Sequence, residues 1–362
     1  MRLQFITSTP LNITQGSGTY AGIRGLAKAL NALGHDVLMV SPKMHLPVYT
    51  LERIVFNESL RLRANVDADA TVGFDMDGYS VAGKKRVPHI ASLKGVIADE
   101  VRFERGLTRF TMAIQQRYER LHVKRAAAVV TTSEYAARCA QEAYGIRARV
   151  IPELIDLAAW REILRTHPPK PAEKRFVVLC VCRLYRRKRV NVLLGAARLL
   201  RDRIPELEIR IVGDGPERAR LAHLWREQKL GDRVRFLGDV TRARLAEEYN
   251  ACHVFCLPSV QEGFGIVYLE AMGAGKPIVA ARAAAVPEVV RHGVLVDPES
   301  EEALAEGIAG LHESEDLRRQ LAREGAAWVE QFDAKRVAER FIDVVREIIE
   351  KSSQAERARQ LQ

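Results

Sequence analysis

Short apolar runs alternate with amphipathic stretches along the chain. The first apolar run is RLQFIT, a helical pattern extends from Tyr20 to Leu33, and DVLMV is the next apolar run. Apolar residues recur every three or four positions in the helical pattern, which places them on one face of a helix. Gly34 then ends the helix. This strand–helix–strand order predicts a parallel sheet.

The alternation occurs in two blocks. Further strands are predicted at TVGF, PHIASL, AAVVTT and RVIP, and then at FVVLCVC, LEIRIVG, VRFLG, HVFCLP, PIVAA and VLVD. Between the blocks, the segment HPPKPAEKR from His167 to Arg175 is rich in proline and charge, which predicts a linker. We therefore expect an α/β protein with two doubly wound, Rossmann-like domains, residues 1–168 and 169–333. A helix within 334–362 is expected to pack back on the first domain.

Length and composition agree with a globular enzyme. A chain of 362 residues is long enough for two cores. It contains no apolar run of the ~20 residues that a membrane helix needs, and the start MRLQFITSTPLN lacks the apolar centre of a signal peptide, so we expect a cytoplasmic protein. The five cysteines are expected to be buried free thiols, because their spacing provides no zinc cluster.

The net charge of +10 favours an anionic partner. Three kinds of partner carry the required negative charge: nucleic acid, a phosphorylated substrate and an acidic membrane. Aromatic residues make up only 6% of the chain and no stacking platform is evident, which argues against nucleic acid.

The segment GSGTYAG, from Gly16 to Gly22, is predicted to form a loop before the first helix. Glycines at such a position let the backbone approach a phosphate, and the helix N-terminus favours negative charge. An NAD site is not expected, because a long loop precedes the glycines and no acidic residue closes the second strand. A turn without a ligand remains the alternative.

Two loops of the second domain carry candidate phosphate-binding groups. Arg183 and Lys188 follow the strand FVVLCVC, and Gly213 and Gly215 follow the strand LEIRI. Cations at a strand's carboxyl end could hold a diphosphate and stabilise it as it leaves. A solvated loop and a plain turn are the alternatives.

The segment SVQEGFGIVYLEAMGAG combines a glycine-bearing loop with an apolar helix. Glu262 is expected in the loop and Glu270 within the helix, among apolar residues. A carboxylate in that setting is costly unless it has partners, which a ribose could supply through two hydroxyls. A structural ion pair or a helix cap would satisfy Glu270 equally well.

Two Asp-x-Asp pairs also occur, Asp67 with Asp69 and Asp75 with Asp77. Such a pair can bind a divalent metal under a diphosphate. We interpret both as loop residues, with Asp77-Gly78 in a turn.

Taken in order, these elements resemble the retaining glycosyltransferases with the GT-B fold, the glycogen synthase-like and mannosyltransferase group (glycosyltransferase family 4-like). The spacing of Glu262 and Glu270 is the most specific feature. Glu153 stands where asparagine is usual. The elements that carry the resemblance are Gly16-Ser17-Gly18, His89, VIPELID, Arg183 with Lys188, VGDGP, EGFG, EAM and Pro287-Glu288.

The resemblance implies roles for these residues. Glu270 would bind the ribose, and Arg183 and Lys188 would hold the diphosphate in place of a metal. His89 would lie near the sugar and the acceptor. Glu262 would hold the donor sugar together with the backbone that follows it. The remaining donor contacts would come from Gly16, Ser17, Gly18, Gly213, Gly215, Gly263, Phe264 and Gly265.

The implied reaction needs no cofactor and no metal. We expect a nucleotide-diphosphate hexose as donor, with UDP-hexose preferred over GDP-hexose, bound in a cleft between the two domains. The acceptor would be a sugar, a polysaccharide, a lipid-linked molecule or a small molecule. A sugar-nucleotide epimerase and a non-catalytic sugar-nucleotide sensor are the alternatives.

A basic stretch, GLTRFTMAIQQRYERLHVKRA, predicts a helix in the first domain. Its cations could touch an anionic membrane. We favour an ordinary helix that covers the sheet, because its apolar residues Phe110, Ile114 and Leu121 are few and suit core packing.

Overall fold

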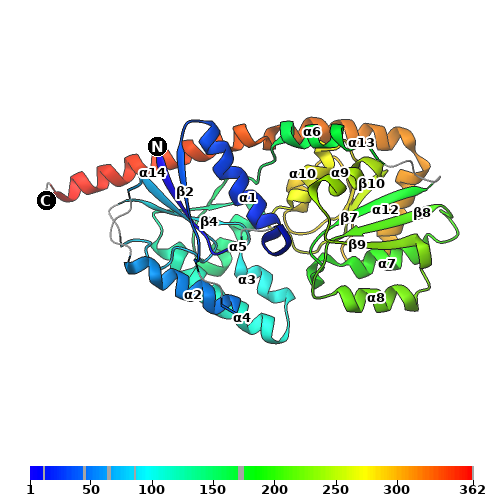
Figure 1. The fold of residues 1–362 in the computed structure, drawn as a ribbon, viewed down its shortest axis with the longest axis horizontal. Helices are drawn as coiled ribbons and strands as arrows, with labels where there is room; N and C mark the ends of the chain where they lie inside the picture. Colours follow the sequence, from blue (N-terminus) through cyan, green and yellow to red (C-terminus); the bar gives the residue numbers. More distant parts are fainter. Residues whose placement is uncertain (11–12, 44–45, 63–66, 85–86, 170–174, 361–362) are drawn as a thin grey trace. The chain divides into compact units, whose positions relative to one another are not determined.

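The computed structural model describes the chain except residues 11–12, 44–45, 63–66, 85–86, 170–174 and 361–362. The side chains of residues 13–17, 355–356 and 358–360 are also outside the description. The chain forms two compact units, Met1–Leu154 with Ala334–Gln362, and Ile155–Asp333. Each unit contains one six-stranded sheet flanked by helices, which confirms the predicted α/β class (Figure 1).

The sheet of the first unit has the strand order β2-β1-β3-β4-β5-β6, and neighbouring strands pair in parallel. Its strands are β1 Arg2–Ile6, β2 Asp36–Val40, β3 Ala70–Phe74, β4 His89–Leu93, β5 Ala128–Thr131 and β6 Arg149–Val150. Its helices are α1 Ile13–Ala32, α2 Tyr49–Ser59, α3 Ile97–Glu100, α4 Gly106–Arg125, α5 Glu134–Tyr144 and α14 Ala334–Gln360.

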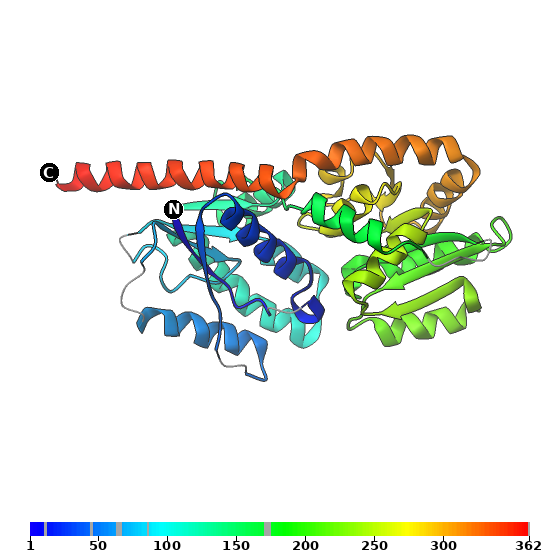
Figure 2. The same cartoon turned by 45° about the horizontal axis from the view of Figure 1, so that its top comes forward.

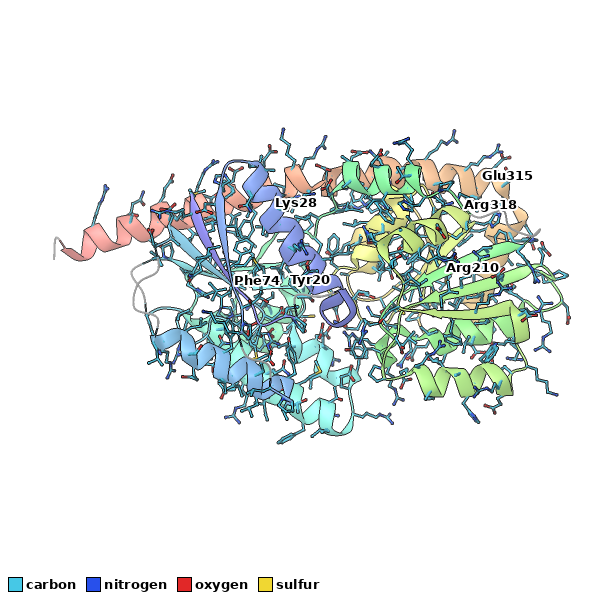
Figure 3. All side chains as sticks on the ribbon, viewed as in Figure 1. Tyr20, Lys28, Phe74, Arg210, Glu315 and Arg318 are labelled. Carbon is cyan, nitrogen blue, oxygen red and sulfur yellow. The ribbon has the colours of Figure 1, made fainter. Side chains whose placement is uncertain are left out.

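Alternate residues of these strands enter cores on opposite faces, as the pleat requires. Ile90 packs with α1 and α14, whereas its neighbour Ala91 packs with α4 and α5. On the first face, the rings of Phe5 and Phe74 meet edge to face at 5.1 Å between centroids (Phe74 is labelled in Figure 3).

The sheet of the second unit has the order β12-β11-β10-β7-β8-β9, again with parallel pairing. Its strands are β7 Phe176–Val181, β8 Leu207–Val212, β9 Val234–Gly238, β10 Val254–Leu257, β11 Ile278–Ala281 and β12 Val294–Val296. Its helices are α6 Leu157–Thr166, α7 Val190–Leu199, α8 Arg218–Glu227, α9 Arg242–Ala251, α10 Ile266–Gly273, α11 Val286–Val289, α12 Glu301–Glu313 and α13 Glu315–Trp328.

Charged groups inside the second unit are paired. Arg210 of β8, labelled in Figure 3, donates to Glu208 at 2.8 Å and to Glu248 of α9 at 2.9 Å. Both carboxylates are almost completely buried, so removing the arginine would leave two buried charges without this partner. The cysteines are free thiols, and Cys180, Cys182, Cys252 and Cys256 are buried as expected.

The boundary between the units lies earlier than the sequence predicts. Helix α6, expected in the first domain, belongs to the second unit, so the division falls at 154 and 155 rather than at 168 and 169. Leu157 and Trp160 of α6 join the second core, and the Trp160 indole donates to the carbonyl of Glu270 at 2.9 Å. The expected linker therefore connects α6 to β7 within one unit, and its residues 170–174 lie outside the described residues.

The first helix also begins earlier than expected. Gly16, Ser17 and Gly18 lie inside α1, which starts at Ile13, and not in a loop before a helix at Tyr20. The prediction relied on glycine as a helix breaker, but an interior glycine costs only about 1 kcal/mol relative to alanine, and tertiary packing can offset that cost. The expectation of a glycine loop is wrong.

The C-terminal helix α14 belongs to the first unit and packs along α1 (Figures 1 and 2). Val337, Phe341 and Val345 enter the first core. Among the described helices, none has a stretch long and apolar enough to span a bilayer.

Candidate functional site

Five loops meet at the carboxyl edge of the second sheet. The loops that follow β11, β10, β7, β8 and β9 stand next to one another, because their strands are consecutive in the sheet. Arg183 and Lys188 follow β7, Glu262 follows β10, and Gly213 and Gly215 follow β8. The edge therefore gathers the loops in which sequence analysis placed the donor site.

An ion pair joins two of these loops. Nζ of Lys188 lies 2.5 Å from Oε1 of Glu262, with the two side chains 14% and 9% exposed. The backbone fixes the same contact, since the carbonyl of Arg187 accepts the amide of Val260 at 2.9 Å. A largely buried ammonium and carboxylate thus face each other at the edge of the sheet. Such a pair can exchange protein contacts for the phosphate and hydroxyl groups of a ligand.

The two glycines of the VGDGP turn are required by packing between loops. Gly213 has a φ of +113°, and a Cβ there would lie 2.1 Å from the carbonyl oxygen of Cys182. A Cβ on Gly215 would lie 2.7 Å from the amide nitrogen of Leu184. The turn after β8 therefore contacts the backbone on both sides of Arg183. Arg183 itself faces Asp239, which follows β9, at 3.9 Å.

Glu270 lies in α10 and is 7% exposed. Oε1 accepts a hydrogen bond from Arg242, and Oε2 accepts one from the Tyr249 hydroxyl at 3.2 Å. The guanidinium of Arg242 also lies 4.1 Å from the centre of the Trp160 ring. The structural ion pair that the sequence left open is therefore present, and Arg242 is a site neighbour that no sequence motif indicated.

Beyond Glu262, the EGFG loop contributes backbone rather than side chains. Phe264 is 5% exposed and its ring packs edge to face on Phe332, so it belongs to the core. Gly265 precedes α10 with a φ of +95°, and a Cβ there would lie 2.6 Å from the Tyr268 ring. From Gly263 to Gly265, this loop therefore offers main-chain groups to a ligand, whereas Glu262 offers its side chain.

His89 does not lie at the carboxyl edge of its sheet. It is the first residue of β4, about 13 Å before the end of that five-residue strand. Its Nδ1 bonds Thr71 Oγ1 at 2.6 Å, and its Nε2 lies 2.7 Å from Nε2 of the buried His122. Burial lowers the pKa of both rings, that of His122 to about 4. The catalytic role expected for His89 does not fit this position. The ring is buried at the amino end of its strand, whereas ligands of such sheets bind at the carboxyl ends.

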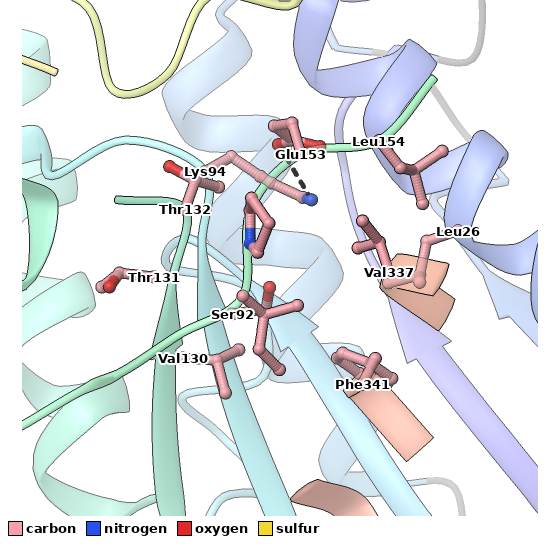
Figure 4. A pocket seen from close by; sticks show the side chains of 12 residues that line it. Leu26, Ser92, Lys94, Val130, Thr131, Thr132, Glu153, Leu154, Val337 and Phe341 are labelled. Carbon is pink, nitrogen blue, oxygen red and sulfur yellow. Dashed lines mark ion pairs between the residues drawn. The ribbon is translucent and has the colours of Figure 1, made fainter. Parts of the chain in front are cut away.

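A different group of polar residues occupies the carboxyl edge of the first sheet. Lys94 follows β4 and Glu153 follows β6, and their charged atoms are 2.9 Å apart with side chains 8% and 6% exposed (Figure 4). They line a pocket with Ser92, Thr131 and Thr132, under Leu26 of α1. A Cβ on Gly22 would lie 2.4 Å from Oε2 of Glu153, so glycine lets α1 cross this carboxylate closely.

The second Asp-x-Asp pair lies in the turn after β3, as predicted, and Asp77 is completely buried there. Asp77 accepts hydrogen bonds from Ser8, Arg53 and Asn57, which occupy both of its oxygens. Asp75 follows β3 with a φ of +54°, accepts the amide of Lys94 at 2.8 Å, and has its pKa raised to about 6 by burial. Asp77-Gly78 lies in a turn as predicted. Among the described residues, no cluster of three or more His, Cys, Asp or Glu is arranged for a metal.

Known proteins share the sequence pattern and the fold of this chain. Residues 164–328 match the family described as glycosyl transferases group 1. In fold, the chain is similar to sucrose-phosphate synthase from Thermosynechococcus elongatus, with a TM-score of 0.81, 22% identity and coverage of 97% of this chain and 100% of the other.

Two curated relatives are similar to this chain in sequence. The phosphatidyl-myo-inositol mannosyltransferase of Mycolicibacterium smegmatis is 29% identical over 350 residues, 90% of this chain and 88% of that protein. The GDP-mannose-dependent alpha-(1-6)-phosphatidylinositol monomannoside mannosyltransferase of Mycobacterium tuberculosis is 32% identical over 166 residues, 43% of each chain. The match thus spans less than half the length of that relative.

Together, these similarities support a GT-B glycosyltransferase of the family 4-like type. The group 1 match covers the second sheet and the loops at its carboxyl edge, where Lys188 meets Glu262.

The buried histidine pair predicts a measurable pH dependence. His122 is neutral in the folded state but takes up a proton near pH 6.5 when unfolded, so it stabilises the fold at neutral pH and that contribution is lost as pH falls. From about pH 7 to about pH 5, wild type should lose about 2 kcal/mol more unfolding free energy than His122→Gln. Burial raises the pKa of Asp75 and Glu119, so their contribution to stability increases as pH falls, opposite to that of His122. Both proteins contain these two carboxyls. The test is therefore the difference in unfolding free energy between wild type and His122→Gln, measured by denaturant unfolding at each pH.

His223→Gln, at an exposed position on α8, is the control and should follow wild type. Equal pH dependence in wild type and His122→Gln would show that His122 is not held neutral.

Glycine substitutions test the contact between the loops. Gly213→Ala should lower the free energy of unfolding by at least about 2 kcal/mol, because its backbone angle and the Cys182 carbonyl both exclude a Cβ. Gly310→Ala, in α12 with nothing within 4 Å of the new Cβ, should instead be neutral or stabilise by up to about 1 kcal/mol. Equal stability of the two variants would contradict the packing described here.

Proposed function

We propose that this protein transfers a hexose from a nucleoside-diphosphate sugar to an acceptor hydroxyl, with retention of configuration and without a metal. The observation that carries the proposal is the ion pair of Lys188 and Glu262, in neighbouring loops at the carboxyl edge of the group 1 domain. It supplies a cation for a diphosphate and a carboxylate for sugar hydroxyls. The first unit would supply the acceptor side.

In this reaction, the bond between the anomeric carbon and the diphosphate oxygen breaks, and the acceptor oxygen forms a new bond to that carbon. The acceptor attacks from the face that the diphosphate leaves, so the configuration is kept, and its proton passes to the departing diphosphate. Lys188, Arg183 and the amides that precede α10 would stabilise the charge that develops on the diphosphate. Glu270, with Arg242 beside it, would receive the ribose hydroxyls.

The donor and acceptor belong to broad chemical classes. Sequence analysis prefers a UDP-hexose, and a relative's name introduces GDP-mannose as the second candidate. Names of the relatives also favour a lipid-linked or inositol-containing acceptor, beside sugars and polysaccharides. An epimerase would convert the donor without an acceptor, and a sensor would bind it without releasing the nucleotide.

Loss of either member of the ion pair should abolish most turnover. Lys188→Ala and Glu262→Ala should each lower kcat/KM for release of the nucleoside diphosphate by about a hundredfold or more, the size expected for removing one group that stabilises the transition state. Arg186→Ala, two residues from Lys188 but exposed to solvent, should keep near-normal rates. Rates near wild type in both site variants, with the fold intact, would overturn the assignment.

Ligand-induced stabilisation should identify the donor. At about a hundred times its dissociation constant, a ligand adds about 2.7 kcal/mol of stability, which raises the Tm by several degrees in a chain of this size. We expect UDP or its hexoses to give a larger shift than the GDP and ADP series, equally with and without EDTA. Turnover that vanishes in EDTA and returns with manganese would contradict the metal-free reaction.

A further inference from the structure

Large apolar side chains lie exposed on two neighbouring helices of the first unit. Leu107 and Phe110 of α4 are 77% and 64% exposed, and Leu51 and Val55 of α2 are 49% and 42% exposed. The two helices are neighbours (Figure 1). Gln115 joins them, since it accepts from Arg53 at 2.9 Å and donates to Thr50 at 2.7 Å. Phe110 was expected to pack in the core, so this exposure corrects the prediction for α4.

The outer face of α4 has two parallel lines of side chains. Leu107, Ile114 and Leu121 are spaced by seven residues, so they lie along one side of the helix. Phe110, Arg117 and Lys124, with the same spacing, form the adjacent line. The opposite side faces the protein, where Gln115, Glu119, His122 and Val123 are buried.

The exposed charges of α4 are all positive. Arg109, Arg117, Arg120 and Lys124 are solvent-exposed and form no ion pair with a described carboxylate. Glu119, the acid of this helix, is completely buried and accepts from the Ile97 amide and the Tyr144 hydroxyl. Many other exposed arginines are paired, such as Arg203 with Glu306 and Glu313.

We propose that this face of α4, with the adjoining apolar side chains of α2, docks on an anionic lipid surface. Exposed apolar side chains flanked by unpaired cations match the interface of a bilayer, where rings and aliphatic groups enter the acyl boundary and cations stay at the headgroups. Nucleic acid would match the cations but would leave Leu107 and Phe110 without a partner. Membrane docking is independent of turnover, and it would bring the first unit to a lipid-linked acceptor.

Vesicle flotation tests this surface without any donor. The full chain should float with phosphatidylcholine vesicles that contain about a third phosphatidylglycerol, and should float at least about tenfold less with pure phosphatidylcholine, because each cation near an anionic surface favours binding. Phe110→Trp should show a blue-shifted emission on the anionic vesicles. Failure of wild type to float at physiological salt would overturn the proposal.

Paired variants separate the two parts of the surface. One variant removes the apolar side chains, Leu107→Ser with Phe110→Ser. A second removes the charges, Arg109→Gln with Arg117→Gln and Arg120→Gln. Each should lower vesicle binding at least about tenfold while thermal unfolding stays unchanged, because these side chains are exposed. Leu199→Ser with Arg226→Gln, which changes one exposed apolar and one exposed basic residue of the second unit, is the matched control and should bind like wild type.

Duplex DNA of mixed sequence serves as a competing polyanion. If DNA binds as tightly as the vesicles, and the Leu107 and Phe110 substitutions leave vesicle binding unchanged, the surface recognises polyanions and the proposal fails. Vesicle binding that depends on both sets of residues would support it.

Discussion

The contact between Lys188 and Glu262 joins two loops at the carboxyl edge of the second sheet. Their loops follow adjacent parallel strands, β7 and β10, and main-chain bonds fix the same approach. Two charges that are largely removed from water stabilise each other only as a pair, and each is costly alone. In the proposed reaction a diphosphate would take over as partner of Lys188, which would release Glu262 for the hydroxyls of the sugar. The resting protein would therefore keep both groups in place for the donor.

The sequence predicted the strands and the second unit's site loops because both depend on local patterns. Each strand is an apolar run bounded by turn residues, and parallel strands covered on both faces produce such runs. Consecutive strands also share a carboxyl edge, so residues far apart in sequence, such as Arg183, Gly213 and Glu262, could be assigned to the same edge before any coordinates. Glu262 and Glu270 were recognisable because carboxylates in apolar or glycine-rich surroundings are unusual.

The misassigned features depend on packing that no local pattern encodes. The segment at Gly16 is helical although it contains glycine, and α6 joins the second unit through Trp160. His89 was placed by motif order, but strand register puts it at the amino end of β4 beside Thr71. Arg242 was missed because its partner, Glu270, comes from a different helix. A single sequence shows residue types, whereas these contacts depend on which elements become neighbours.

The position of α14 has a consequence for how the protein is made. The first unit comprises two separate stretches, and the second is inserted between them as one continuous stretch. During synthesis, the core that holds Phe341 and Val345 lacks those side chains until nearly the whole chain has emerged, whereas all of the second unit has already been translated. The half proposed to bind the donor can thus mature first, while the half proposed to receive the acceptor waits for its last helix. A chain truncated before α14 would keep a complete second core, but the face of the first sheet that α1 and α14 share would be covered by α1 alone.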